Sequence, residues 1–241
     1  PRRDALMTPL RLTRAGIAGT ALALAVAAAC ARLGLWQLDR LEQRRERNRA
    51  IAARLAAPPL PLAGLVADTT GLLYRRVLVE GVYDDGHTVV LRGRSLHGTP
   101  GVHILTPLRL AGGHAAVLVN RGWVPAPDAA TVDRAALRQP GTVRLQGIAL
   151  PLPPAPSRPA APFRGAVREL DPGALRRAVP YRLLDITVQA LPEPGAPPVP
   201  VRLPPPTLDD GPHLGYAIQW FGFAAIALAG WTALAVRRAT R

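Results

Sequence analysis

The residues best suited to bind a cofactor lie where the C-terminal apolar segment begins. His213, Tyr216 and Trp220 fall on one side of a helix, because spacings of three, four and seven residues return to the same face. A neutral imidazole can ligate haem iron, and aromatic side chains can pack against the macrocycle. His213 is therefore a candidate axial ligand, with Tyr216 and Trp220 as candidate cofactor-binding neighbours. The alternative is a hydrogen-bonded histidine that caps the start of the helix at a membrane interface.

A second motif, Trp36-Gln37-Leu38-Asp39-Arg40, follows the N-terminal apolar segment. Taken alone, it is typical of an interfacial tryptophan beside a charge pair. If both apolar segments cross a membrane, however, this motif and His213 lie at the same outer face. We therefore predict a site between the two spans, in which Trp36 and Arg40 complete the surroundings of His213.

A third motif, Asn120-Arg121-Gly122-Trp123, ends a predicted strand. Gly122 permits a bulge or a close backbone approach, and residues two apart on a strand share a face. One interpretation is a contact surface for a partner, in which Arg121 binds a carboxylate and Trp123 stacks. The other is a structural corner in which Arg121 pairs with an internal acid. The sequence alone leaves both open.

The rest of the sequence offers little reaction chemistry. The only serines, Ser95 and Ser157, lie outside any nucleophile elbow, and no phosphate-binding glycine loop occurs. The single cysteine, Cys30, lies inside an apolar segment and has no partner for a disulfide or metal site. The formal net charge is +14, but the 30 basic residues, all arginine, are spread along the chain, so nucleic-acid binding is not indicated. We expect no enzyme.

Two apolar segments, 15–36 and 214–236, are candidate transmembrane helices. Basic residues precede the first and follow the second, so the positive-inside rule places both tails, 1–14 and 237–241, in the cytoplasm. Residues 37–213 then lie outside the cytoplasm, in the periplasm of a Gram-negative cell. A signal peptide cleaved after Ala27-Ala28-Ala29 is the alternative for the first segment.

Between these segments the pattern predicts an antiparallel β-rich domain, a barrel or a sandwich, with short helices. A charged helix is expected at 37–55, and alternating apolar residues with intervening turns predict strands. The expected strands are 74–83, 87–91, 101–110, 115–124, 142–150 and 181–190. A short helix is expected at 128–138, another starts at Asp171-Pro172, and the proline-rich stretches 151–162 and 192–206 are expected to be extended linkers.

In this order, the motifs resemble the surfeit-locus-one family of cytochrome oxidase assembly proteins. The matching segments are 33–40 (LGLWQLDR), 74–77 (YRRV), 81–84 (GVYD), 101–107 (GVHILTP), 117–125 (VLVNRGWVP) and 213–221 (HLGYAIQWF). They cover nearly the whole chain, whereas 151–164 and the region after Glu169 match loosely, so nothing is carried over there.

The resemblance implies a non-enzymatic membrane chaperone that binds haem a and helps to deliver it to subunit I of a haem-copper oxidase. The family's proposed iron ligand corresponds to His213. The resemblance also favours the contact-surface interpretation of Arg121 and Trp123. The implied partners are oxidase subunit I, other oxidase assembly factors, haem a synthase and the lipid bilayer.

Overall fold

The computed structural model describes residues 14–62, 69–156 and 165–239, which form two compact units. The first comprises residues 1–50 and 208–241, and the second comprises residues 51–207. Most of the expected N-terminal tail, the last two residues and residues 157–162 of the first expected linker lie outside the described ranges.

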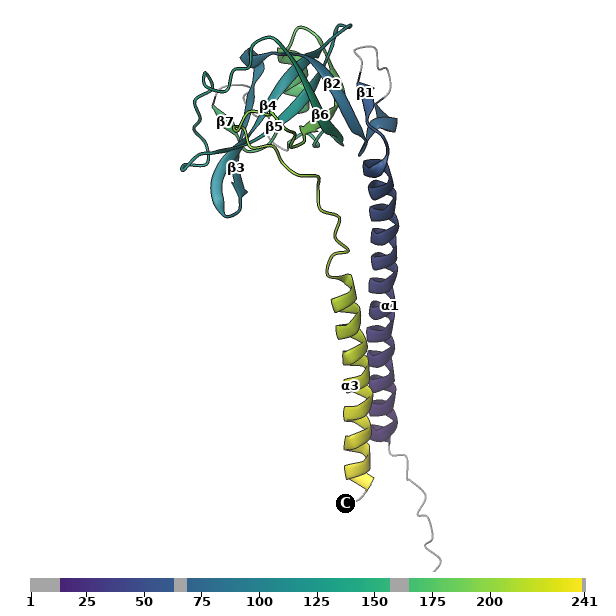
Figure 1. Cartoon of the computed structure of the whole chain (residues 1–241). Helices are drawn as coiled ribbons and strands as arrows, with labels where there is room; N and C mark the ends of the chain where they lie inside the picture. The colour runs from purple at the N-terminus through teal and green to yellow at the C-terminus, as the bar shows by residue number, and fades with distance from the viewer. Residues whose placement is uncertain (1–13, 63–68, 157–164, 240–241) are drawn as a thin grey trace, which may run out of the picture. The chain divides into compact units, whose positions relative to one another are not determined.

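The first unit contains two antiparallel helices that run side by side (Figure 1). Helix α1 (Arg14–Ala56) has 43 residues and α3 (His213–Ala239) has 27. The expected span 15–36 and the expected charged helix 37–55 are one continuous helix, about 65 Å long at 1.5 Å per residue. The boundary expected after residue 36 therefore marks a change in surface, from apolar to charged, and not the end of a helix.

The two helices pack through small residues. A Cβ atom added at Gly19 would lie 1.9 Å from the ring of Trp231, and one at Gly34 would lie 2.8 Å from the ring of Phe221. The less exposed positions of α3 recur at alternating intervals of four and three residues, which is the spacing of a coiled-coil seam; they are His213, Ala217, Trp220, Ala224, Ala227 and Trp231. Small residues let two helix backbones approach closely.

Both helices are long and apolar enough to cross a membrane, and most of each apolar stretch is exposed. Leu22, Ile218 and Ile226 are more than half exposed. A core helix of a soluble protein would bury such side chains, so the pair suggests membrane association.

The second unit is a closed β-barrel. Its ring contains β2 (Arg76–Tyr83), β6 (Thr142–Pro151), β8 (Arg182–Ala190), β5 (Ala115–Pro125) and β4 (Thr99–Leu110), and β4 pairs back to β2. The sheet is extended by β1 (Leu60–Leu62), β3 (Val89–Leu96) and β7 (Ala166–Val167). Short 3₁₀ turns cover Thr70–Leu72 and Asp85–His87.

The sheet is mainly antiparallel, as expected, but three pairs are parallel: β5–β8, β1–β2 and β3–β7. A closed ring with an odd number of strands cannot alternate direction all the way round. At least one neighbouring pair must be parallel, and here that pair is β5–β8. Of the two predicted forms, barrel or sandwich, the structure has a barrel, and the parallel pairs are an addition to the predicted antiparallel sheet.

The barrel closes where β2 changes partner. Residues Arg76–Val82 of β2 pair with β6, and Gly81–Tyr83 pair with β4. A Cβ atom at Gly81 would lie 2.1 Å from the carbonyl oxygen of Arg109. Only glycine leaves room for this approach. Inside the ring, alternate residues of β2 and β5 are fully buried, including Val77, Val79, Val117 and Val119.

Two local expectations failed and one was confirmed. No helix forms at 128–138, because the Asp128 and Asp133 side chains accept hydrogen bonds from backbone N–H groups two and three residues later and hold turns instead. The 192–206 stretch is no free linker, because Val201 pairs with Trp123 through two backbone hydrogen bonds of 2.7 and 2.8 Å. Asp171 caps α2 (Pro172–Ala178), as predicted, by accepting from the Ala174 N–H at 2.9 Å.

Gly81→Ala tests the closure of the barrel. The added methyl group would meet backbone that cannot move aside, so we expect a loss of about 1–3 kcal/mol in the free energy of unfolding. Gly71→Ala is the control, because nothing lies within 4 Å of its Cβ position; we expect a change within about 0.5 kcal/mol. Denaturant unfolding of the full chain followed by circular dichroism measures both. Equal stability of the two variants would contradict the close approach.

Candidate functional site

His213 is the first residue of α3 and contacts α1. Its Nδ1 atom lies 2.9 Å from Oε1 of Gln37, which belongs to the motif that follows the N-terminal apolar segment. The ring is half-buried on the contact face of the helix pair. An amide oxygen only accepts hydrogen bonds, so this contact is a hydrogen bond in the tautomer that carries its proton on Nδ1, and in that tautomer the lone pair is on Nε2.

A polar clamp holds the chain just before His213. Arg44 Nε and Asn48 Nδ2 donate to the carbonyl oxygen of Asp209 at 3.2 and 2.8 Å, and Arg45 pairs with Asp210 at 2.9 Å. These groups are exposed, so each contact contributes little to stability by itself. Together they fix the height of His213 along α1, next to Gln37 and above the apolar part of the helix pair.

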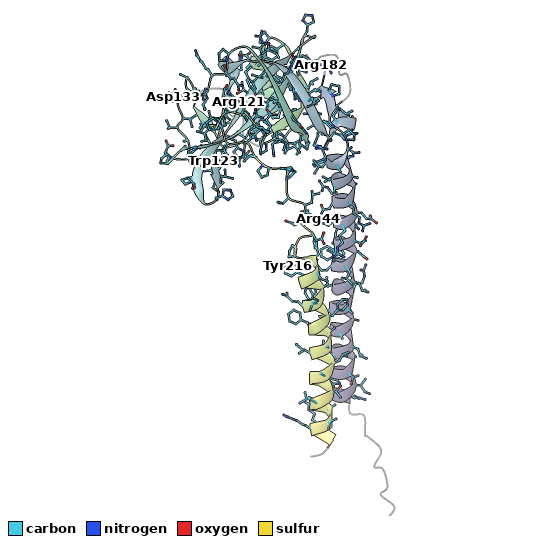
Figure 2. All side chains as sticks on the ribbon, in the orientation of Figure 1. Arg44, Arg121, Trp123, Asp133, Arg182 and Tyr216 are labelled. Atoms are coloured by element: carbon cyan, nitrogen blue, oxygen red, sulfur yellow. The ribbon has the colours of Figure 1, made fainter. Side chains whose placement is uncertain are left out.

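The other predicted cofactor-binding residues lie near this end of the helix pair, with separate contacts. Trp36 and Arg40 contact each other, with the guanidinium carbon of Arg40 5.5 Å from the ring centroid of Trp36. Tyr216 is 47% exposed and projects from the first turn of α3 (Figure 2). Trp220 lies on the contact face and meets Phe223 edge to face at 5.8 Å. The structure therefore joins His213 to the N-terminal motif through Gln37, and not through Trp36 or Arg40.

This geometry fits an axial ligand. Histidines that bind a metal commonly donate their other ring N–H to a carbonyl or carboxylate, which fixes the tautomer and orients the ring. Gln37 supplies that carbonyl, and the exposed rings of Trp36 and Tyr216 offer aromatic surface to a flat ligand. Among the described residues, no cluster of three or more histidine, cysteine, aspartate or glutamate side chains is placed to hold a metal ion.

Arg121 and Trp123 are in the other unit, and both are buried, with 6% and 7% exposure. Arg121 is the extra residue of a β-bulge, because Asn120 pairs with Leu105 and Gly122 with Ile104. A Cβ atom at Gly122 would lie 2.3 Å from the carbonyl oxygen of Val201, so the predicted bulge and close approach are both confirmed.

The two side chains do not form a shared outer surface. The guanidinium of Arg121 lies over the Tyr83 ring at 4.5 Å and is 3.5 Å from both Asp85 and Gln139. The indole of Trp123 covers Gly101 instead. Figure 2 labels both residues within the β unit. The arrangement corresponds to the structural-corner interpretation, whereas a partner that binds these side chains would first have to uncover them.

Burial shifts the pKa values of Tyr83 and Arg121. It raises the pKa of Tyr83 to about 12, although the nearby positive charge of Arg121 opposes the rise. Burial also lowers the pKa of Arg121, and the neighbouring Tyr83 and Asp85 oppose that change.

A separate polar cluster joins β8 to the loop after β2. Asp84 Oδ2 accepts from the Tyr181 hydroxyl and contacts Nδ1 of His87, each at 2.7 Å. Burial acts to raise the pKa of Asp84, but the hydrogen bonds from Tyr181 and His87 outweigh it and lower the pKa. The pKa of Tyr181 is raised, first by burial and then by Asp84. We interpret this cluster as structural, because the polar groups of Asp84, Tyr181 and His87 interact with one another.

Sequence reasoning missed Gln37 and Tyr83. Gln37 lies inside the motif Trp36–Arg40, and its place beside Trp36 was the available signal. No local signal marks Tyr83, because its contact with Arg121 depends on the closure of the barrel.

Arg121→Met distinguishes the two interpretations of the third motif. If Arg121 supports the domain, its removal leaves Asp85 and Gln139 without a partner, and we expect a loss of about 1–3 kcal/mol in the free energy of unfolding. Adding Asp85→Asn should recover part of that loss. Denaturant unfolding of the full chain measures both. An Arg121→Met protein as stable as the wild type would show that this arginine is free to bind a partner.

Comparison with known proteins agrees with the motifs. The family model described as the SURF1 family matches residues 24–225. A SURF1-like protein of Monosiga brevicollis is 35% identical over 126 residues, 48% of each chain. Surfeit locus protein 1 of Takifugu rubripes is 30% identical over 108 residues, 39% of this chain and 45% of that protein. The corresponding Arabidopsis thaliana protein is 34% identical over 105 residues, 39% of this chain and 30% of that protein.

The matches thus span about half or less of these relatives. Because the family model covers most of the sequence, from α1 through the barrel into α3, the chain belongs to the SURF1 family.

Proposed function

We propose that this protein assists the assembly of a haem-copper cytochrome oxidase by binding haem a and passing it to subunit I. Membership of the SURF1 family supports the role in oxidase assembly. The observation that carries the haem part is the contact between His213 Nδ1 and Gln37 Oε1, which leaves Nε2 as a free ligand atom. The protein acts as a carrier in this proposal, with haem a as cargo and no reaction catalysed.

Each residue of the site has a distinct task. His213 supplies Nε2 as the ligand atom. Gln37 accepts a hydrogen bond from Nδ1–H and so favours the tautomer in which Nε2 is unprotonated. Tyr216, Trp220 and Trp36 offer aromatic surface to the macrocycle, and Arg40 supplies a cation for a carboxylate. The cargo, when bound, supplies a Lewis-acidic iron that accepts the imidazole lone pair.

The same proposal places the protein in a cell membrane. Two spans put both termini in the cytoplasm, because Arg237 and Arg238 lie in the last turn of α3 and arginines precede α1. The barrel then lies outside the cytoplasm, where it is available to subunit I, to haem a synthase and to other assembly factors.

His213→Ala and Gln37→Leu test the site. We expect the alanine variant to lose the visible absorption of bound haem a, because the ligand nitrogen is gone. Gln37→Leu keeps the ligand but loses its orientation, so haem affinity should fall on the order of tenfold or more. The measurement is the visible spectrum of the full chain, purified from cells that make haem a, and titration of haem into the apoprotein.

Gln219→Leu is the matched control, because it makes the same substitution at an exposed position of α3. Its spectrum should equal that of the wild type. Retention of the full haem a spectrum by His213→Ala would remove His213 from the proposal.

A cofactor-free scaffold is the second candidate. The His213–Gln37 hydrogen bond would also be expected of a histidine that only ties the start of α3 to α1. This function predicts that oxidase subunits co-purify with the protein while no haem does, and that Gln37→Leu lowers stability without changing any spectrum.

A further inference from the structure

Three arginines converge on a cavity in the β unit, apart from the residues of the candidate site. Arg92, Arg94 and Arg168 line it together with Asp128 and the loop residues Ala129 and Ala130, and its volume is about 270 Å³. No hydrogen bond or ion pair from these three arginines to a protein group occurs in the described part of the chain.

The sheet itself forces these charges together. Strands β3 and β7 are parallel, with Leu91 opposite Val167, so the next residues, Arg92 and Arg168, leave the pairing side by side. The β3–β4 register shifts between Leu91 and Arg94, and Gly93 has a φ of +70° within that irregularity. This bulge brings Arg94 to the cavity that Arg92 also lines.

The opposite wall is fixed by the loop after β5. The Gly93 N–H donates to the carbonyl oxygen of Ala129 at 3.0 Å, which ties the loop to the bulge. Ala129 has a φ of +51°, a conformation that an alanine rarely adopts. The cavity is therefore held open between two anchored segments of backbone.

The one acid at the cavity does not neutralise the arginines. Asp128 Oδ1 accepts from the N–H groups of Ala130 and Thr131 at 2.9 and 2.8 Å. Hydrogen bonds from the side chain and backbone of Thr131, then from Ala130, hold the pKa of Asp128 at about 2. The carboxylate of Asp128 is thus hydrogen-bonded within its own turn. Three arginines and one aspartate give the cavity a net charge of +2. Like charges on adjacent strands repel each other. Arg92 and Arg168 are exposed, so solvent screens part of this repulsion, and a bound anion would remove more of it.

We propose that this cavity binds a dianionic phosphate group, as in a phosphate monoester. Three guanidinium groups can reach the three oxygens of a phosphate, which carries a charge of about −1.5 to −2 at neutral pH. A carboxylate has two oxygens and one charge, and so matches the site less well. The group could belong to a soluble monoester or to the headgroup of a phosphomonoester lipid, and the chemistry of recognition is the same.

The test uses the full chain in phosphatidylcholine nanodiscs, with glycerol 3-phosphate as the probe and calorimetric titration as the measurement. We expect the wild type to bind glycerol 3-phosphate more tightly than acetate. The double variant Arg92→Gln, Arg168→Gln removes the adjacent pair, and its affinity should fall on the order of tenfold or more. Circular dichroism confirms that the variant is folded.

Arg138→Gln with Arg177→Gln is the control, because it removes the same charge from two exposed arginines outside the cavity. Its affinity should equal that of the wild type. An equal loss in both double variants, or no binding by the wild type, would overturn the proposal. If phosphatidic acid in the nanodiscs blocks the probe, the source is a lipid headgroup; if it does not, the source is a soluble monoester.

Discussion

The position of His213 depends on the register between α1 and α3, and small residues set that register. Gly19 lies under Trp231 and Gly34 under Phe221, so neither helix can slide along the other without driving a ring into backbone. Trp231 also donates to the Thr20 hydroxyl at 3.0 Å. With these contacts fixed, the first turn of α3 must meet α1 at Gln37. The contact between His213 and Gln37 at one end of the helix pair is thus a consequence of packing along its whole length.

The barrel depends on a similar constraint. Five strands form the ring, so one neighbouring pair has to be parallel, and one strand has to leave one partner for another. Glycine permits the exchange at position 81, and Gly122 lets the 192–206 stretch lie against the bulge of β5. That stretch closes over Arg121, for which the sequence left a contact surface and a structural corner open, and the arginine is buried.

These constraints explain what the sequence could and could not predict. Apolar runs bounded by turns located β2, β4, β5, β6 and β8; β2 alternates because it buries one face, whereas β4 and β5 are buried on both faces. The motif around His213 was recognisable because polar residues beside an apolar helix are unusual. Gln37 was not identified as a partner, since a contact over 176 positions depends on the helix register. The 128–138 helix was predicted wrongly because the aspartates at 128 and 133 favour turns over helix.

The arginines show why composition alone carries so little functional information. Arg44 and Arg45 tie the chain before His213 to α1, and the salt bridges they form are exposed and weak. Arg121 is buried against the ring of Tyr83 in the barrel. Arg92, Arg94 and Arg168 line one cavity, and the described residues around it supply a single negative charge, that of Asp128. A repulsion of this kind persists in a folded protein only where solvent screens it or a ligand removes it. Because β3 and β7 are parallel at this point, Arg92 and Arg168 leave the strands as neighbours, and since both residues are exposed, solvent screens their charges and leaves them accessible to an anion.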